Sequence, residues 1–292
     1  MAPLPSIAVT QSGAFVAVGG TRSGGSGYAD DLVIIKGAAA TTGTLPGGGR
    51  IGALEVPLSS ELVLVWGGNV DGATANVAAL VDASQAAANA GSAIAVSDID
   101  AVPYAAAGAL VGQNASVYQV LVVGGGTIGA GGNFGASSIT SPRLQVVTVD
   151  TGTKTATIDD LTVPPELAGP LTRAYATLAV LPAGDFLFFG GYTAFTSVSL
   201  CSTPSDCLPK SIVRFSVTDP GGTATVAKLD PDLALDGGPL GSNAVQLTDG
   251  AWLVTTGVDS ITSATLGKDP GLVRLANPVT DLCAIVPPPT TP

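Results

Sequence analysis

The sequence contains no histidine, and this absence removes several common kinds of active site. General acid–base catalysis uses histidine more often than any other side chain. A structural zinc site needs four Cys or His ligands, whereas this chain has three cysteines. There is no Gly-x-Ser-x-Gly nucleophile motif, and the glycine-rich segments open no helix, as a phosphate-binding loop would. Any acid–base chemistry would therefore depend on carboxylates, as it does in glycosidases.

Charged side chains are scarce, and basic ones are the scarcest. Only 11% of the residues are charged, with 11 Lys and Arg against 22 Asp and Glu, for a net charge of -11. Nucleic acids and anionic membranes attract basic patches, so we expect no nucleic-acid partner and no membrane insertion. No apolar run approaches the roughly 18 residues of a membrane span.

The three cysteines bear on the compartment in which the protein folds. Cys201 and Cys207 enclose a five-residue loop flanked by turn-forming residues, which predicts a local disulfide; two unpaired loop thiols are the alternative. Cys283 stands in an apolar segment and is expected to be a buried free thiol. Residues 1–5 lack the features of a signal peptide, so the chain is either cytosolic or has lost its signal. The predicted disulfide favours a secreted or cell-surface protein.

One segment recurs along the whole chain, and it is a short apolar run that ends in glycine. The clearest copy is Asp185–Gly191, and the others are Ala14–Gly20, Leu62–Gly68, Gln119–Gly125 and Ala251–Gly257. Runs rich in β-branched and aromatic residues and cut off by glycine are typical of buried strands. The copies start 48, 57, 66 and 66 residues apart, which predicts stacked β units of four strands each.

Further strands are predicted between these copies from alternating side chains and turn residues. The alanine-rich tract 73–96 fits either a helix or two strands, and the repeat context favours strands. Residues 287–292 are expected to form a Pro/Thr-rich linker tail. The other strands expected are 7–10, 32–35, 41–45, 53–58, 104–110, 144–150, 154–158, 174–179, 212–218, 223–229, 242–247, 272–275 and 281–285.

The segment 171–191 resembles the kelch repeat in its secreted bacterial form. The matching features are Arg173 before a strand of small residues, the Pro-Ala-Gly-Asp turn at 182–185, and the apolar run into Gly190-Gly191. Arg50 opens the second repeat in the same way. The resemblance implies an all-β fold, a β-propeller of five four-stranded blades in a single domain over residues 1–286. The alternative is part of a six- or seven-bladed ring, completed by an adjoining segment or neighbouring domains of a longer chain, or by a second chain.

Ring closure in such a propeller would bring the first and last blades together. No spare strand is left at either end of the chain, so this contact must form by side-chain packing alone unless Ala2 to Pro5 pairs weakly on an edge. Apolar residues such as Ile34 and Leu272 are expected on the two outer faces that meet there.

The same resemblance bears on function. Copper enzymes of the galactose-oxidase type share the kelch-like propeller, but their site uses histidine ligands, and this sequence has none. Other kelch-like propellers serve as binding scaffolds, usually for proteins and sometimes for glycans. We therefore expect a secreted or cell-envelope binding or adhesion module for a protein or glycan. A carboxylate-dependent glycan hydrolase or lyase on the same scaffold is the alternative.

Long connections are expected to place a binding site on one face of the propeller. Four of the five repeated segments are followed by long loops, at 21–30, 126–143, 192–210 and 258–271, and loops much longer than about 6 residues tend to be functional. Trp66 lies inside a strand and is expected in the core rather than on a sugar-binding platform. The residues expected to bind the ligand on this face are Arg22, Asn69, Asp71, Asn133, Tyr192 and Asp259.

Aspartates recur between the repeats. Aspartate is common in turns, where its side chain hydrogen-bonds the backbone, and this is one explanation of the pattern. The other is a ring of carboxylates that binds Ca²⁺ or a cationic partner, although no twelve-residue calcium loop is present and no other cofactor is expected. The candidate ligands are Asp98, Asp100, Asp159, Asp160, Asp230 and Asp232.

Overall fold

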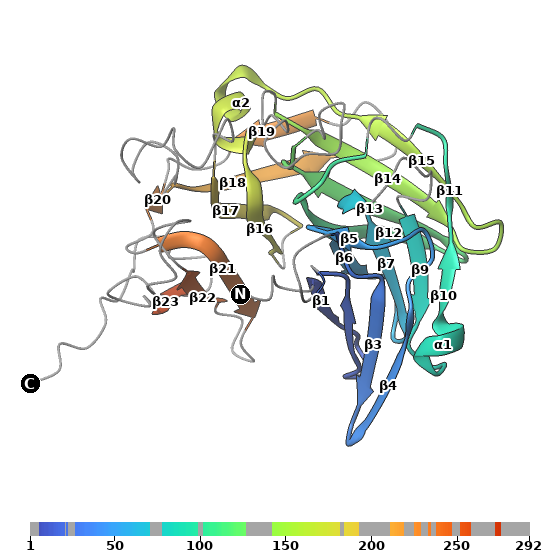
Figure 1. The fold of residues 1–292 in the computed structure, drawn as a ribbon. Helices are drawn as coiled ribbons and strands as arrows, with labels where there is room; N and C mark the ends of the chain where they lie inside the picture. Colours follow the sequence, from blue (N-terminus) through green and yellow to red (C-terminus); the bar gives the residue numbers. More distant parts are fainter. Residues whose placement is uncertain are drawn as a thin grey trace, which may run out of the picture. The chain divides into compact units, whose positions relative to one another are not determined.

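The computed structural model shows an all-β protein built from antiparallel sheets (Figure 1). The residues it describes are 6–20, 22, 27–70, 78–98, 102–126, 142–181, 184–192, 211–218, 225–228, 233–234, 238–246, 252–257 and 272–275. The chain divides into two compact units, residues 1–138 with 144–161 and residues 139–143 with 162–292. No helix among the described residues is long and apolar enough to cross a membrane.

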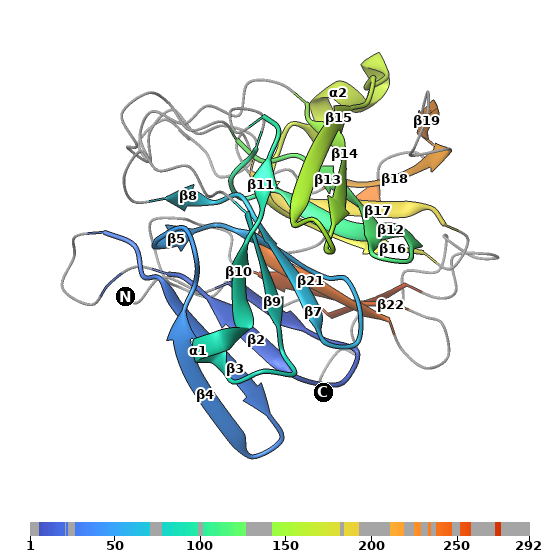
Figure 2. The same ribbon diagram turned by 90° about the vertical axis from the view of Figure 1, so that its right-hand side faces the viewer.

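The first compact unit contains two four-stranded sheets whose strands lie side by side in chain order. Sheet 1 consists of β1 (Ser6–Val9), β2 (Phe15–Val18), β3 (Asp31–Lys36) and β4 (Ala39–Thr44). Sheet 2 consists of β6 (Leu54–Pro57), β7 (Leu62–Trp66), β9 (Ala78–Asp82) and β10 (Gly91–Ala93). A ribbon of β5 (Arg50–Ile51) and β8 (Asn69–Val70) accompanies sheet 2, and the short helix α1 (Ala87–Ala90) lies against β3 and β4 (Figure 2).

Sheet 3 completes this unit and has five strands. Its strands are β11 (Ala95–Val96), β12 (Ala107–Asn114), β13 (Val117–Val123), β14 (Leu144–Asp150) and β15 (Thr155–Asp160). Strands β12 to β15 follow one another, whereas β11 leaves the end of sheet 2 and pairs in parallel with β15 at the outer edge. The sequence predicted no such crossing, because it assigned Val96 to the last strand of the second repeat.

Sheet 2 is packed on both of its faces. In β7, Val63 and Val65 join a cluster with Val16 and Ile34 of sheet 1. The alternate residue Leu64, with Trp66, joins a second cluster with sheet 3. A strand that buries both faces has no polar positions to alternate with, which explains the unbroken apolar run of β7.

Sheet 1 has one covered face and one exposed apolar face. Ile34 is 3% exposed and belongs to the covered face, so the expectation that it lies on an outer face was wrong. Its neighbour Ile35 points the other way and is 41% exposed. Ile7, Val9 and Phe15 share that exposed face, with exposures of 61%, 49% and 49%.

The second compact unit contains sheets 4 and 5 and the helix α2 (Pro165–Leu171). Sheet 4 consists of β16 (Ala174–Val180), β17 (Phe186–Tyr192), β18 (Ser211–Thr218) and β19 (Thr225–Lys228), with β20 (Leu233–Ala234) also paired to β18. Sheet 5 consists of β21 (Gly238–Gln246), β22 (Trp252–Gly257) and β23 (Leu272–Leu275). The strand expected at 281–285 and the tail 287–292 lie outside the described residues.

The Gly-Gly pairs allow close approach of two backbones where strands end. Gly67 and Gly68 both have positive φ, at 67° and 89°, which side-chain-bearing residues rarely adopt. A Cβ atom on Gly67 would overlap the carbonyl oxygen of Pro103, which lies in the segment that leads into sheet 3. The glycines are therefore required by the joining of successive repeats as well as by the turn.

Candidate functional site

Three of the six residues predicted to bind a ligand fall among the described residues. Arg22 and Asp30 form an exposed ion pair, with Nη2 and Oδ1 3.6 Å apart. Asn69 lies in β8, where it pairs with Ile51, and Tyr192 ends β17 opposite Ala174. The remaining three candidates, Asp71, Asn133 and Asp259, lie outside the described residues.

The predicted carboxylates occupy different settings. Asp98 is exposed after β11, and Asp159 and Asp160 form the end of β15 rather than a connection between repeats. Gln145 Nε2 donates to Asp160 Oδ1 at 2.8 Å. In the part of the chain described, no three His, Cys, Asp or Glu residues gather as a metal site would require. The remaining candidates Asp100, Asp230 and Asp232, and the cysteines Cys201, Cys207 and Cys283, lie outside it.

The two arginines that carry the kelch resemblance are buried. Arg50 is 0% exposed, and its Nη2 donates to the carbonyl oxygen of Pro46 at 2.9 Å. Burial lowers the pKa of the Arg50 guanidinium to about 10, which leaves it charged at neutral pH. Arg173 is 1% exposed and lies over the ring of Phe188, 5.8 Å from its centre. These side chains are buried within the fold.

Glu55 is a buried carboxyl of a different kind. It lies in β6 opposite Val65, both of its oxygens are buried, and no described group hydrogen-bonds to them. Burial raises the pKa of Glu55 well above its ordinary value, because desolvation disfavours the charged form. Glu55 lies apart from the pocket described next.

A pocket of about 390 Å³ opens between sheets 2 and 3, within the first compact unit. This volume falls within the usual range of small-molecule sites. Sheet 2 and α1 supply most of its lining, and the turn between β14 and β15 supplies the rest. The lining residues are Leu62, Leu80, Asp82, Gln85, Asn89, Ala90, Ser92, Thr151 and Lys154.

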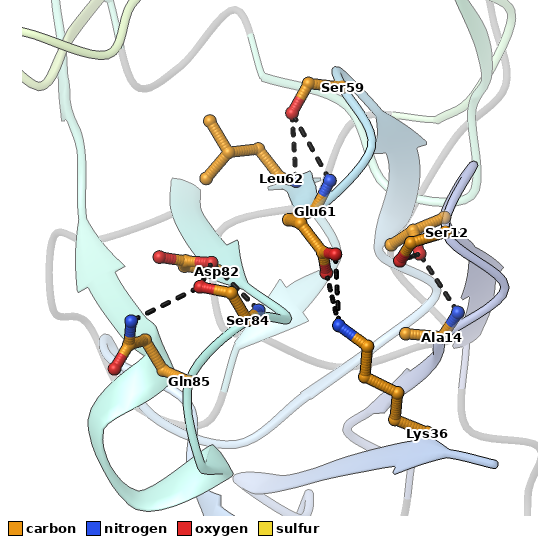
Figure 3. A network of polar contacts seen from close by, with 10 residues as sticks. Ser12, Ala14, Lys36, Ser59, Glu61, Leu62, Asp82, Ser84 and Gln85 are labelled. Carbon is orange, nitrogen blue, oxygen red and sulfur yellow. Dashed lines mark hydrogen bonds and ion pairs between the residues drawn. The ribbon is translucent and has the colours of Figure 1, made fainter.

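On the sheet 2 side, a turn fixed by Asp82 shapes the pocket wall. Asp82 ends β9, and its Oδ1 accepts hydrogen bonds from the backbone N–H and the hydroxyl of Ser84, at 2.9 and 2.6 Å (Figure 3). Gln85 Nε2 donates in turn to Ser84 Oγ at 3.2 Å (Figure 3). Aspartate side chains stabilise turns in this manner. The turn leads into α1, which carries Asn89 to the pocket rim.

On the sheet 3 side, the hairpin turn is held at several points. Asp150 Oδ1 accepts hydrogen bonds from the backbone N–H of Gly152 at 2.8 Å and from Ser116 Oγ at 3.1 Å. Hydrogen bonds, above all that from Gly152, lower the pKa of Asp150. Thr151 Oγ1 donates to the carbonyl oxygen of Ser116 at 3.0 Å, and Ala95 N–H donates to that of Lys154 at 3.0 Å. Thr151 and Lys154 therefore extend from a fixed turn.

The pocket lining combines apolar side chains with polar groups, some of which have no partner among the described residues. Leu62, Leu80 and Ala90 are the apolar members, and Leu80 and Ala90 are almost fully buried. Within the described residues, neither the Asn89 amide nor the Lys154 ammonium makes a hydrogen bond or ion pair, and Asp82 Oδ2 accepts none. These polar groups remain available to a ligand.

Sheets 1 and 2 are joined by an ion pair, unlike the pocket between sheets 2 and 3. In that pair Lys36 Nζ reaches both carboxylate oxygens of Glu61, at 3.0 and 3.1 Å (Figure 3). Asp82 and Lys154 carry opposite charges into one pocket, yet no ion pair joins them among the described contacts. The space between sheets 2 and 3 is therefore not closed by a charge pair.

This pocket was missed by the sequence reasoning, which placed a site on the long loops. It lies at the other ends of the strands, where β9 runs into the turn at 83–86 and β14 turns at 151–154. Each turn has a sequence signal, Asp82-Ala-Ser84 and Asp150-Thr-Gly152. Nothing in the sequence shows that these two turns, almost 70 residues apart, face one another.

Comparison with known proteins indicates similarity of fold. No protein-family model matches the sequence, and no curated protein sequence matches it. A copper-bound fungal alcohol oxidase of the AA5 family matches 90% of the chain at 13% identity, with a TM-score of 0.50. A chain from a complex of RAG with one melted and one unmelted RSS matches 89% of it at 16% identity, with a TM-score of 0.52.

These likenesses concern the fold alone, because both identities are low. The present chain spans 60% of the alcohol oxidase chain and 75% of the RAG chain. Neither comparison assigns a ligand or an activity to the pocket.

Proposed function

We propose that the chain is a kelch-like β-propeller that acts as a binding or adhesion module for a protein or glycan, outside the cell or on its surface. The pocket between sheets 2 and 3 is the observation that carries the binding role. Within the described residues, the Asn89 amide, the Lys154 ammonium and Asp82 Oδ2 have no partner. Asp82 and Lys154 lie at turns that are already fixed, so a ligand meets preformed groups. The long loops that follow the repeated strands, with Arg22 among the described residues, are a second candidate for the same role.

The propeller arrangement is supported by the order of strands within the sheets. In sheets 1 and 2 the strands lie in chain order, as in an up-and-down blade, although β8, between β7 and β9 in the chain, pairs with β5 instead. The likeness to two solved structures over about nine-tenths of the chain agrees with a fold of this class. Five such sheets would form five blades, with sheet 3 gaining an extra edge strand.

The alternative role as a glycan hydrolase or lyase draws less support. Glycoside hydrolysis ordinarily uses two carboxyl groups on either side of the scissile bond. Asp82 is the single acidic residue among the described residues that line the pocket. The copper in the alcohol oxidase structure does not extend to this chain, whose sequence contains no histidine.

Incubation of the purified chain with a glycan array and with an array of extracellular proteins tests this proposal. We expect saturable binding to members of one array, with the bound glycan recovered intact. Release of a shortened or unsaturated product would favour the enzyme instead. Absence of binding on both arrays would refute the proposed role as a module.

A further inference from the structure

We propose that the pocket between sheets 2 and 3 takes a neutral sugar ring. This ligand class rests on the binding role proposed above and makes it specific for one site. A pyranose ring presents C–H groups on its faces and hydroxyls around its edge. The pocket lining offers both kinds of group, with Leu62, Leu80 and Ala90 as apolar members and Asp82, Asn89 and Lys154 as polar ones. Sites of this kind bind through apolar contact and gain orientation from a few polar groups.

The charges of the rim favour a neutral ligand over an ion. Asp82 would repel a bound phosphate or carboxylate, and Lys154 would repel a bound cation. A hydroxyl group both donates and accepts hydrogen bonds, so it can satisfy Lys154, Asp82 Oδ2 and the Asn89 amide alike. A sugar can therefore form hydrogen bonds with all three of these groups. An anion would be repelled by Asp82, and a cation would be repelled by Lys154.

The remaining lining residues agree with this class. Ser92 and Thr151 are uncharged, and they offer hydroxyl oxygens that accept hydrogen bonds. A zwitterion such as an amino acid would match Asp82 and Lys154 but would leave these neutral groups unused. No aromatic ring stands among the described lining residues to stack on the sugar, so we expect a Kd on the order of 1 mM for a single ring.

Ligand-observed NMR on the full chain can test the site. The probes are methyl glycosides of glucose, galactose and mannose, with inorganic phosphate and glycine as charged comparisons. Asn89→Ala removes a rim amide whose side chain makes no described hydrogen bond, so the fold should be retained, which circular dichroism checks. We expect at least one methyl glycoside to bind and Asn89→Ala to weaken it about tenfold.

A matched pair of lysine variants serves as the control. Lys154→Met should weaken glycoside binding, whereas Lys36→Met, which removes an exposed lysine that pairs with Glu61, should leave it unchanged. Equal loss in both variants, or preference for phosphate or glycine over every glycoside, would overturn the sugar proposal. Glycan binding that persists in Asn89→Ala and Lys154→Met would place the site elsewhere and leave the module role intact. Absence of both glycan and protein binding would remove the role itself.

Discussion

Arg214 and Asp185 are joined by two hydrogen bonds to a single carboxylate oxygen. Arg214 Nη2 and Nε donate to Asp185 Oδ2 at 2.6 and 3.1 Å, and both side chains are less than one-fifth exposed. Asp185 ends the Pro-Ala-Gly-Asp turn of the kelch-like segment, and Arg214 lies in β18, opposite Leu187. The pair therefore ties the start of β17 to the neighbouring strand.

Replacement of one partner should destabilise sheet 4 more than replacement of a surface ion pair. Asp185→Ala leaves a mostly buried guanidinium without its carboxylate, and we expect a loss of about 2 kcal/mol in the free energy of unfolding. The matched control is Asp30→Ala, which breaks the exposed pair with Arg22 and should cost less than about 1 kcal/mol. Urea denaturation measures both, and equal losses would show that burial of the Arg214 pair contributes nothing.

Glu55 should make the protein less stable as the pH rises. Its folded-state pKa is raised, so between the unfolded value of about 4.3 and the higher folded value the native state holds a proton that the unfolded state has lost. The free energy of unfolding therefore falls as pH increases through this window and levels off above the folded pKa. Glu55→Gln should remove this fall and raise stability at pH 8. Denaturant titrations at pH 4 to 9 would refute the idea if the two proteins gave parallel curves.

Gly67 should tolerate alanine less well than Gly13 does. Both glycines have positive φ, at 67° and 82°, so alanine is strained at either position by about 1 to 2 kcal/mol. Open space surrounds a Cβ at Gly13, whereas at Gly67 it would overlap the Pro103 carbonyl. We expect Gly67→Ala to cost about 1 to 3 kcal/mol more than Gly13→Ala. Thermal denaturation of the two variants gives the difference directly, and a difference near zero would mean that the backbones move apart freely.

The exposed face of sheet 1 offers a test of ring closure. In a closed propeller this face is covered by another sheet, and Phe15→Asp would then bury a charge and cost several kcal/mol. On a face that stays open, the same change at a 49% exposed position should alter stability by less than about 1 kcal/mol. Val16→Asp, at a fully buried position of the covered face, sets the scale of a buried charge. A Phe15→Asp protein as stable as the original would exclude the closed ring.

The central strands could be predicted because the sequence marks both their length and their end. An apolar run gives the length, and a glycine pair gives the end. Leu62–Trp66 is apolar throughout and stops at Gly67-Gly68, so β7 is nearly fixed by composition. For the tract 73–96 two strands were favoured over a helix. Its described part, 78–96, has three short strands and one helical turn at 87–90, and the last strand pairs in sheet 3. Helix α2 was missed, although Pro165 at its start and Glu166 in its first turn are both favourable there.

Relationships between repeats could not be predicted, because they depend on how faces meet. Alternation shows that Ile34 and Ile35 lie on opposite faces of sheet 1, but not which of them sheet 2 covers. The pocket could not be predicted for the same reason, because Asp82 and Lys154 belong to different repeats and meet only when these repeats pack together. The long-loop residues were chosen by loop length alone, and their role stays a prediction.

The parallel pairing of β11 with β15 has a consequence during synthesis of the chain. Ala95 lies opposite Thr155, so sixty residues must leave the ribosome after Ala95 before its partner exists. At ordinary translation rates this delay lasts roughly 3 to 12 s, far longer than a hairpin needs to form. Strands β12 to β14 thus have time to assemble while β11 waits unpaired, and the arrival of β15 then fastens sheet 3 to the chain that leads out of sheet 2.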